Sequence, residues 1–296
     1  MRTAFSLVGL TAVAAAYKSS TVSSWSDNPS KLGSVIVLTP NTIASKPALI
    51  LALHPCGGSG SGYQSMTTLP SQIDALNFIM IFPTSNKEDG FNCWDAFSTK
   101  SNVHGGGGDS QGLAGLTKQV IQQYGADTNK VFVIGASSGA MESNVLAATY
   151  PDIFKAAVSY SGVPAGCWLG AASSTPLATD QSCPLGSKAS TYSAKQWTDL
   201  VKQAYPSYTG SYPKMMIVHG TADFAVTINN LGAQLTQWSN MAGVTFSQNV
   251  TNTPIQSWKK IVYGDGTKVV GYEVQGGGHI PPFQLGITLD WFGLKK

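Results

Sequence analysis

The sequence predicts an α/β fold with a mostly parallel central sheet and helices on both faces. Short apolar runs alternate along the chain with segments of helical periodicity, the pattern of strands joined by crossover helices. Several of these runs are continuous in Val, Ile, Leu and Met, which is typical of strands buried on both faces. With 43% hydrophobic and 11% charged residues, the composition excludes disordered and coiled-coil proteins.

Strands and helices are expected to alternate within one domain, at residues 17–296. We predict strands at Ser34–Leu38, Ala48–His54, Phe78–Phe82, Lys130–Ile134, Ala156–Ser159, Met215–His219, Trp258–Tyr263 and Val269–Val274. We predict helices at Asp109–Tyr124, Ser138–Thr149, Ala194–Ala204, Thr227–Met241 and Phe283–Trp291. No Pro/Ser/Thr-rich linker or internal repeat separates them. Active sites in such sheets form at the carboxyl ends of the strands.

Residues 1–16 have the pattern of a secretory signal peptide. Arg2 precedes a short apolar run that ends in Ala14-Ala15-Ala16, an A-x-A cleavage site. A first core helix is the alternative. No other segment has 18 uninterrupted apolar residues, so we expect no membrane span and an extracellular mature protein.

The four cysteines fit an exported protein with two disulfides. Three pairings are possible, and we predict the nearest-neighbour one, Cys56–Cys93 and Cys167–Cys183. The second bridge would close a short loop rich in Ser, Ala and Pro. No C-x-x-C spacing occurs, so we expect no zinc site, and Asn249 begins a glycosylation sequon.

The charge distribution favours an uncharged partner. The net charge is +3 and Lys and Arg do not cluster, so nucleic-acid binding has no support. The glycine-rich segment after His54 lacks the Gly-Lys-Ser/Thr of a phosphate-binding loop. We expect a monomer with no metal or organic cofactor.

The segment 135–139, Gly-Ala-Ser-Ser-Gly, lies between a predicted strand and a predicted helix. This is the setting of a nucleophile elbow, in which flanking glycines permit a sharp turn and the central serine is presented to substrate. Ser137 is therefore the expected nucleophile. A tight turn without chemistry is the alternative, and the neighbouring Ser138 lacks the symmetric glycine frame.

A nucleophilic serine needs a histidine as base and an acidic residue that orients the histidine. In this kind of fold the acidic residue follows the serine in the chain, and the histidine follows the acidic residue. Of the four histidines only His219 and His279 follow Ser137. His279 lies in a glycine-rich loop after the last predicted strand, and we predict it as the base. His219 ends a strand, where hydrogen bonding to nearby backbone is expected. Asp223, between Ser137 and His279, is the expected acid.

Several other residues are weaker candidates. Asp265 lies in a hairpin-turn sequence and Glu273 lies inside a strand, so both are poorer acids than Asp223. The glycine-rich segment at 102–112 is expected to form a mobile loop near the site, with a flexible connection as the alternative. Aromatic rings stack on sugars, and Trp94, Trp168 and Tyr160 are candidate substrate contacts or core residues.

The oxyanion formed during acyl transfer needs two N–H donors. The backbone N–H of Ser138, at the start of a helix, is one candidate. The backbone N–H of Cys56, in the loop after Ala48–His54, is the other. A Cys56–Cys93 bridge would fix that loop in position.

The chain carries four separated motifs, "LHPCGGSGSGY", "GASSGAMESNVLAATYPDIFKAAVSYSGVPAGCW", "MMIVHGTAD" and "GGGHIPP". Together they resemble the fungal secreted esterases of carbohydrate esterase family 1, the acetyl xylan esterases, over essentially the whole mature chain. That group is related to feruloyl esterases and polyhydroxybutyrate depolymerases. The resemblance implies an α/β-hydrolase fold, a triad of Ser137, Asp223 and His279, and oxyanion donors at Cys56 and Ser138. Many members carry an aromatic residue directly before the first cysteine, where this chain has Pro55.

The resemblance implies a secreted serine esterase that removes acetyl groups from xylan in the plant cell wall. A feruloyl esterase with a wider acyl pocket is the nearest alternative, followed by a polyester depolymerase. A non-catalytic carbohydrate-binding protein on the same scaffold and a peptidase are more distant. The lining of the acyl pocket distinguishes the esterases, and sequence alone does not place it.

Overall fold

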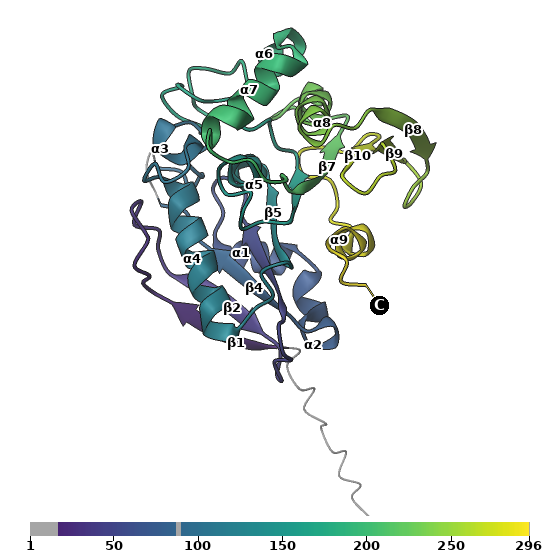
Figure 1. Cartoon of the computed structure of the whole chain (residues 1–296). Coiled ribbons are helices and arrows are strands. Elements are labelled where there is room, and N and C mark those ends of the chain that lie inside the picture. The colour runs from purple at the N-terminus through teal and green to yellow at the C-terminus, as the bar shows by residue number, and fades with distance from the viewer. Residues whose placement is uncertain (1–16, 87–89, 296) are drawn as a thin grey trace, which may run out of the picture.

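A mixed sheet forms the centre of the computed structural model, which describes residues 17–86 and 90–295 (Figure 1). The expected signal peptide at 1–16 lies outside the described residues. Within them the sheet is ten-stranded, in the order β1-β2-β4-β3-β5-β6-β7-β10-β9-β8. The strands are β1 Lys18–Val22, β2 Val35–Thr39, β3 Ala48–Leu53, β4 Phe78–Pro83, β5 Val131–Ala136, β6 Ala156–Tyr160, β7 Lys214–Gly220, β8 Phe246–Thr251, β9 Trp258–Tyr263 and β10 Val269–Val274.

The centre of the sheet is parallel and its two ends are antiparallel. Strands β4, β3, β5, β6, β7 and β10 pair in parallel, for example Leu49 of β3 with Val131 of β5. The antiparallel strands are β1 and β2 at one end and β9 and β8 at the other. The carboxyl ends of the parallel strands therefore meet along one edge of the sheet, where a site is expected.

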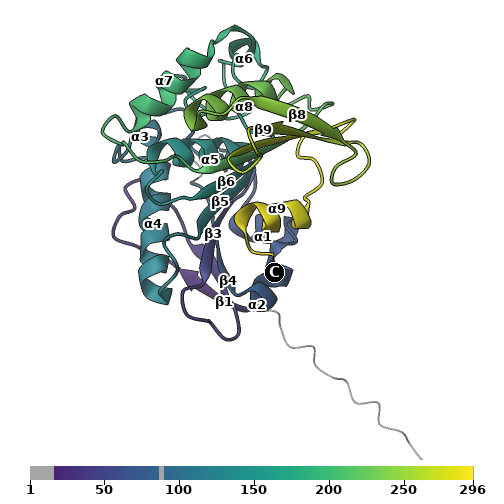
Figure 2. The ribbon, with the colours of Figure 1, turned by 45° about the vertical axis from the view of Figure 1, so that its right-hand side comes forward.

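Helices cover both faces of the sheet because alternate residues of each central strand point in opposite directions. Leu49 and Leu51 pack beneath α4, α5 and α8, whereas Ile50 and Ala52 pack beneath α1, α2 and α9. Figure 2 shows α4 and α9 on opposite sides of the strands. The helices are α1 Gly60–Met66, α2 Ile73–Leu76, α3 Thr99–Asn102, α4 Asp109–Tyr124, α5 Ser138–Thr149, α6 Ser187–Thr191, α7 Ala194–Ala204, α8 Asn229–Ala242 and α9 Leu285–Phe292, with a 3₁₀ turn at Leu69–Gln72.

The predicted fold class is confirmed, and all eight predicted strands and five predicted helices are present. The sequence missed the two edge strands, β1 and β8. Both consist largely of polar, exposed residues, so neither carries a burial pattern. It also missed the short helices α1, α2, α3 and α6, which have seven residues or fewer.

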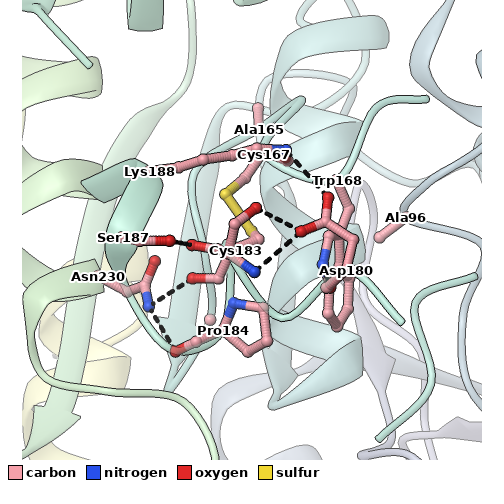
Figure 3. The surroundings of a disulfide bond; sticks show 12 residues. Ala96, Ala165, Cys167, Trp168, Asp180, Cys183, Pro184, Ser187, Lys188 and Asn230 are labelled. Carbon is pink, nitrogen blue, oxygen red and sulfur yellow. Dashed lines mark hydrogen bonds and ion pairs between the residues drawn. A yellow bond between two sulfur atoms is a disulfide. The ribbon is translucent and has the colours of Figure 1, made fainter. Parts of the chain in front are cut away.

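The long connection between β6 and β7 forms a separate layer above the sheet edge. It holds α6 and α7, and its side chains form a third apolar cluster with Met141 and Val145 of α5. The disulfide Cys167–Cys183 closes the first part of this connection (Figure 3). The second disulfide joins Cys56 to Cys93, so both predicted bridges form.

Candidate active site

Ser137 lies at the sharp turn between β5 and α5. Its φ of +52° is a left-handed conformation that serine rarely adopts, and its N–H donates to the carbonyl of Tyr160 at 2.8 Å. The flanking glycines are required by close packing. A Cβ at Gly135 would lie 2.0 Å from the carbonyl oxygen of Gly139, and one at Gly139 would lie 2.1 Å from that of Leu53.

The structure brings together the serine, histidine and aspartate that the sequence singled out. His279 Nε2 lies 2.8 Å from Ser137 Oγ, and His279 Nδ1 lies 2.9 Å from Asp223 Oδ2. The three residues follow β5, β7 and β10 at the same edge of the sheet. With the proton on Nδ1 donated to Asp223, Nε2 can accept the Ser137 hydroxyl proton, as general-base activation of a serine requires.

Asp223 is buried and held by four donors. Its Oδ1 accepts from the N–H groups of Ala225 and Val226 at 3.0 and 2.9 Å. His219 Nε2 lies 2.8 Å from the carbonyl of Val226 and 3.2 Å from Asp223 Oδ2. Because a carbonyl can only accept, His219 Nε2 must carry a proton, which Asp223 shares.

Opposing effects act on the pKa of the Asp223 carboxyl. Burial by itself raises this pKa, but hydrogen bonds from His219 and His279 outweigh it and hold the pKa well below its usual range. Asp223 therefore stays ionised beside His279, where a carboxylate orients the ring and stabilises its protonated form. The predicted backbone hydrogen bond of His219 is present, but its contact with Asp223 was missed.

A short hydrogen-bonded link places the loop that carries His279. The next residue, Ile280, has a φ of +59°, which is unusual for a β-branched side chain. Its N–H donates to Ser161 Oγ at 3.2 Å, and Ser161 is itself buried with a φ of +55°. The loop after β6 thus holds the loop after β10 in the conformation that turns His279 toward Ser137.

The two expected oxyanion donors, Cys56 and Ser138, border the same pocket as Ser137 and His279. Within the described residues, neither backbone N–H donates to another protein group, so both are free to bind an oxyanion. The Cys56–Cys93 disulfide ties down the loop after β3. His54 adds to this, because its Nδ1 donates to the carbonyl of Pro55 at 2.7 Å and its Nε2 accepts from Ser85 at 3.0 Å.

A cavity of about 240 Å³ opens beside Ser137. We call it the Ser137 pocket, and its lining is Cys56, Ser137, Ser138, Met141, Trp168, Ser174, Thr175, Pro176, Gln181, Pro184, Leu185, Phe224, Ala225, Val226 and His279. Seven of these fifteen residues come from the connection between β6 and β7, part of which Cys167–Cys183 closes. No Asp, Glu, Lys or Arg is among these described residues, so the pocket suits an uncharged, partly apolar group.

The three aromatic candidates occupy different positions. Trp94 is fully buried, packs against His54, and donates from Nε1 to the carbonyl of His54 at 2.9 Å. Tyr160 is buried beneath α9 and does not border the Ser137 pocket. Only Trp168 lines that pocket, anchored by Nε1 to the carbonyl of Asp180 at 3.1 Å. We therefore replace the expected sugar contacts of Trp94 and Tyr160 with packing roles.

The weaker candidates lie away from the described pocket. Residues 102–112 join α3 to α4, and His104 in this segment stacks on Tyr205 with ring centroids 3.7 Å apart. None of these residues lines the Ser137 pocket, although Asp109 lines a neighbouring cavity together with Ser174 and Thr175. Asp265 accepts from Thr267 in an exposed turn, and Glu273 pairs with Lys259 at 2.7 Å.

Phe224, directly after Asp223, was not singled out from the sequence. Its side chain is 84% exposed and borders the Ser137 pocket. The only available signal was its position beside a candidate acid at the end of a strand.

In residues 17–86 and 90–295, no group of three or more His, Cys, Asp and Glu is placed to hold a metal ion. Nor is any helix there long and apolar enough to span a bilayer.

A family model described as esterase PHB depolymerase matches residues 32–251. The chain belongs to this family. The matched region holds Ser137 and Asp223, and His279 follows it. Membership of this esterase family, together with the esterase relatives reported below, makes the protein a carboxylic ester hydrolase.

The curated relatives of this chain include fungal enzymes of two kinds, feruloyl esterases and acetylxylan esterases. "Feruloyl esterase B" of Talaromyces funiculosus is 42% identical over 275 residues, covering 93% of this chain and 76% of that protein. "Acetylxylan esterase" of Coprinopsis cinerea is 40% identical over 277 residues, covering 92% of this chain and 72% of that protein. Both relatives are named as esterases, and the second is named for acetylxylan.

Solved structures agree on the fold. An acetyl xylan esterase from Aspergillus awamori superposes with a TM-score of 0.87 at 33% identity, covering 94% of this chain and all of that chain. A feruloyl esterase module from Clostridium thermocellum superposes with a TM-score of 0.60 at 13% identity, covering 96% of this chain and 90% of that chain, which shows the fold alone. The fold is that of the α/β-hydrolases.

Proposed function

We propose that the protein hydrolyses ester groups on xylan-type polysaccharides through a Ser137–His279–Asp223 triad. The observation that supports this most strongly is the continuous hydrogen-bonded path from Ser137 Oγ through His279 to Asp223. Ser137 Oγ attacks the ester carbonyl while His279 Nε2 takes its proton, and the carbonyl oxygen becomes an oxyanion. The N–H groups of Cys56 and Ser138 bind that oxyanion.

The intermediate then collapses in two stages. His279 gives its proton to the leaving sugar oxygen as the ester bond breaks, which leaves an acyl group on Ser137. Water, losing a proton to His279, attacks this acyl-enzyme, and the acid product departs as Ser137 regains its proton. Asp223 orients His279 in both stages and stabilises its protonated form.

The Ser137 pocket favours a larger acyl group than the acetyl group expected from the sequence. The apolar side chains of Met141, Trp168 and Val226 line one connected cavity with room beyond two carbons. Burying apolar surface is favourable by about 25 cal/mol per Å². A flat aromatic acyl group buries more apolar surface in this cavity than an acetyl group does. We therefore propose hydroxycinnamoyl esters such as feruloyl groups as the preferred substrates.

Acetylated xylan is the second candidate. It is favoured by the structural match over 94% of this chain to an acetyl xylan esterase, with a TM-score of 0.87. In this alternative the same triad acts, and the apolar part of the Ser137 pocket holds sugar rather than acyl group.

The deciding experiment compares acid release from feruloylated arabinoxylan and acetylated xylan by the same purified protein. We expect a higher kcat/KM for ferulate, and a higher value for acetate would assign the second candidate instead.

A serine-reactive phosphonate should label Ser137 and block both activities. Ser137→Ala should lower kcat by about a thousandfold or more, while Ser207→Ala, on an exposed loop, should not. Activity retained in Ser137→Ala would remove the triad proposal.

We also propose that the protein is secreted as a monomeric domain of residues 17–296 after loss of residues 1–16. The two disulfides support an oxidising compartment. Amino-terminal sequencing of protein secreted by a eukaryotic host should begin at Tyr17, and a chain that stays in the cell with Met1 would contradict this.

A further inference from the structure

Three large apolar side chains stand in water around the mouth of the Ser137 pocket. Phe224 is 84% exposed, Leu177 is 76% exposed and Leu185 is 52% exposed. Phe224 and Leu185 line the pocket, and Leu177 follows Pro176, which also lines it. We call these three residues the apolar rim.

The fold does not account for the apolar rim. Phe224 and Leu177 are the two most exposed large apolar side chains of the described residues, and neither belongs to a core cluster. Other exposed apolar residues, such as Phe246 and Ile255, do not border the pocket. Exposed apolar groups that gather at a site, rather than scatter singly, mark a surface that binds something.

We propose that the apolar rim is the docking surface for the sugar rings that flank the scissile ester, with Phe224 as its aromatic platform. This inference rests on the proposed function, because it assigns the polysaccharide part of the substrate to named residues. A sugar ring presents C–H groups on its faces, which pack on aromatic and aliphatic side chains, and hydroxyls on its edge.

The surroundings of the rim fit a neutral polysaccharide. Thr175 and Gln181, which line the same pocket, are uncharged and able to hydrogen-bond to hydroxyl groups. A lipid surface would call for Lys or Arg beside the apolar groups, and no such residue is found in the described lining of the pocket.

The segment that carries Leu177 and Leu185 is fixed before substrate arrives. The Cys167–Cys183 disulfide closes the part that holds Leu177 and lies just before Leu185, and Lys188 Nζ contacts both the Cys167 carbonyl at 2.8 Å and Asp180 Oδ2 at 3.4 Å (Figure 3). Ser174 Oγ donates to the carbonyl of Trp94 at 2.9 Å, which attaches the segment to the body of the domain. A surface ordered in advance loses less entropy on binding than a mobile one.

The test compares a polymer with a small ester that has the same acyl group, feruloylated arabinoxylan and methyl ferulate. Phe224→Ala should lower kcat/KM on the polymer about fivefold more than on the small ester, the size of one aromatic contact. Phe224→Tyr keeps the ring and should restore the polymer activity. Phe246→Ala, which removes an exposed phenylalanine from β8, should change neither rate.

Each other outcome has a definite meaning. Equal losses on both esters, or no loss on the polymer, would overturn the assignment of the rim while leaving the proposed esterase intact. A wild-type protein that hydrolyses neither of these esters nor acetylated xylan would instead overturn the proposed function. If the wild type is a dimer in solution and Phe224→Ala a monomer, the rim is an interface between copies and the inference fails.

Discussion

We expect acid to affect the proposed active site by protonating the carboxylate of Asp223. Hydrogen bonds from His219 and His279 hold the pKa of its carboxyl below the usual range, against the effect of burial. A carboxyl whose pKa is depressed on folding adds stability above its unfolded pKa and loses it as pH falls through the folded value. His219 therefore contributes both to the ionisation of Asp223 and to a part of the fold's stability that is present near neutral pH and lost in acid.

We predict that His219→Phe, which keeps a ring and removes the donor, lowers kcat about tenfold, as expected for loss of a hydrogen bond to a charged group. With one donor gone, the pKa of Asp223 rises, so the acid limb of the kcat–pH profile should move to higher pH. His219→Gln offers an amide N–H and should recover part of the loss. His104→Ala, a histidine outside the pocket, is the control, and an unmoved acid limb in His219→Phe would contradict this role.

Glu142 is a buried carboxyl on α5 that has no place in the proposed mechanism. Neither of its oxygens has a hydrogen-bond partner among the described residues. Burial raises the pKa of this carboxyl well above its usual value, and the nearby charges of Asp109 and Asp95 add to the effect. The folded state then holds a proton that the unfolded chain releases, so stability falls as pH rises above the unfolded pKa.

We predict that Glu142→Gln, which keeps the shape and removes the charge, raises Tm at pH 7 by at least about 2 °C. The gain should shrink as pH is lowered toward about 4, because both side chains are then neutral. Thermal unfolding across this pH range tests the prediction, with Glu273→Gln on the surface as the matched control. A gain that does not depend on pH would contradict the charge-based explanation.

At the scale of elements, each disulfide holds a different part of the proposed site. Cys56–Cys93 fixes the loop after β3, which offers the Cys56 N–H, whereas Cys167–Cys183 fixes a wall of the Ser137 pocket. The two bridges close segments of 37 and 16 residues. Removal of either should destabilise the fold by about 3–4 kcal/mol on chain-entropy grounds, yet the kinetic effects should differ.

We predict that the double variant Cys167→Ser/Cys183→Ser raises KM with a smaller change in kcat, because the wall that binds substrate loses its order. Cys56→Ser/Cys93→Ser should mainly lower kcat, because an oxyanion donor is displaced in the transition state. Steady-state kinetics well below each variant's Tm would measure this. The same pattern of KM and kcat in both variants would contradict the division of roles.

Across the whole molecule, the sheet has a protected centre and two exposed edges. Strand β8 forms one edge, and all six of its residues are exposed. Such an edge carries unpaired backbone groups that can pair with another chain. Asn249, in a glycosylation sequon, lies on this strand, and an attached glycan there would block that pairing.

We predict that protein secreted by a eukaryotic host carries a glycan at Asn249, and that Asn249→Gln removes the added mass. The variant should keep its esterase activity but aggregate faster on storage, as measured by light scattering. Asn240→Gln, on the exposed side of α8 and outside any sequon, is the control. An unchanged mass in Asn249→Gln would show that the sequon is unused.

Much of the architecture followed from local patterns, and the exceptions have physical causes. The buried strands and long helices were predictable because burial imposes a period on their residues. Strands β1 and β8 were not, because an exposed edge strand buries too little to leave a pattern. In the candidate site, Ser137 and the two glycines around it were predictable, because a tight turn packed closely against neighbouring backbone restricts which residues fit.

Local periodicity and chain order were enough to predict the order of the elements, the expected elbow serine, and the histidine and aspartate that follow it. Which aromatic rings lie open at the Ser137 pocket, in contrast, depends on how distant segments pack. Trp94 is buried while Phe224 is exposed, although both follow strands and both are large and apolar. The difference lies in what covers each ring, which depends on segments distant in sequence: Trp94 packs against His54 within the main core cluster, whereas Phe224 belongs to no core cluster.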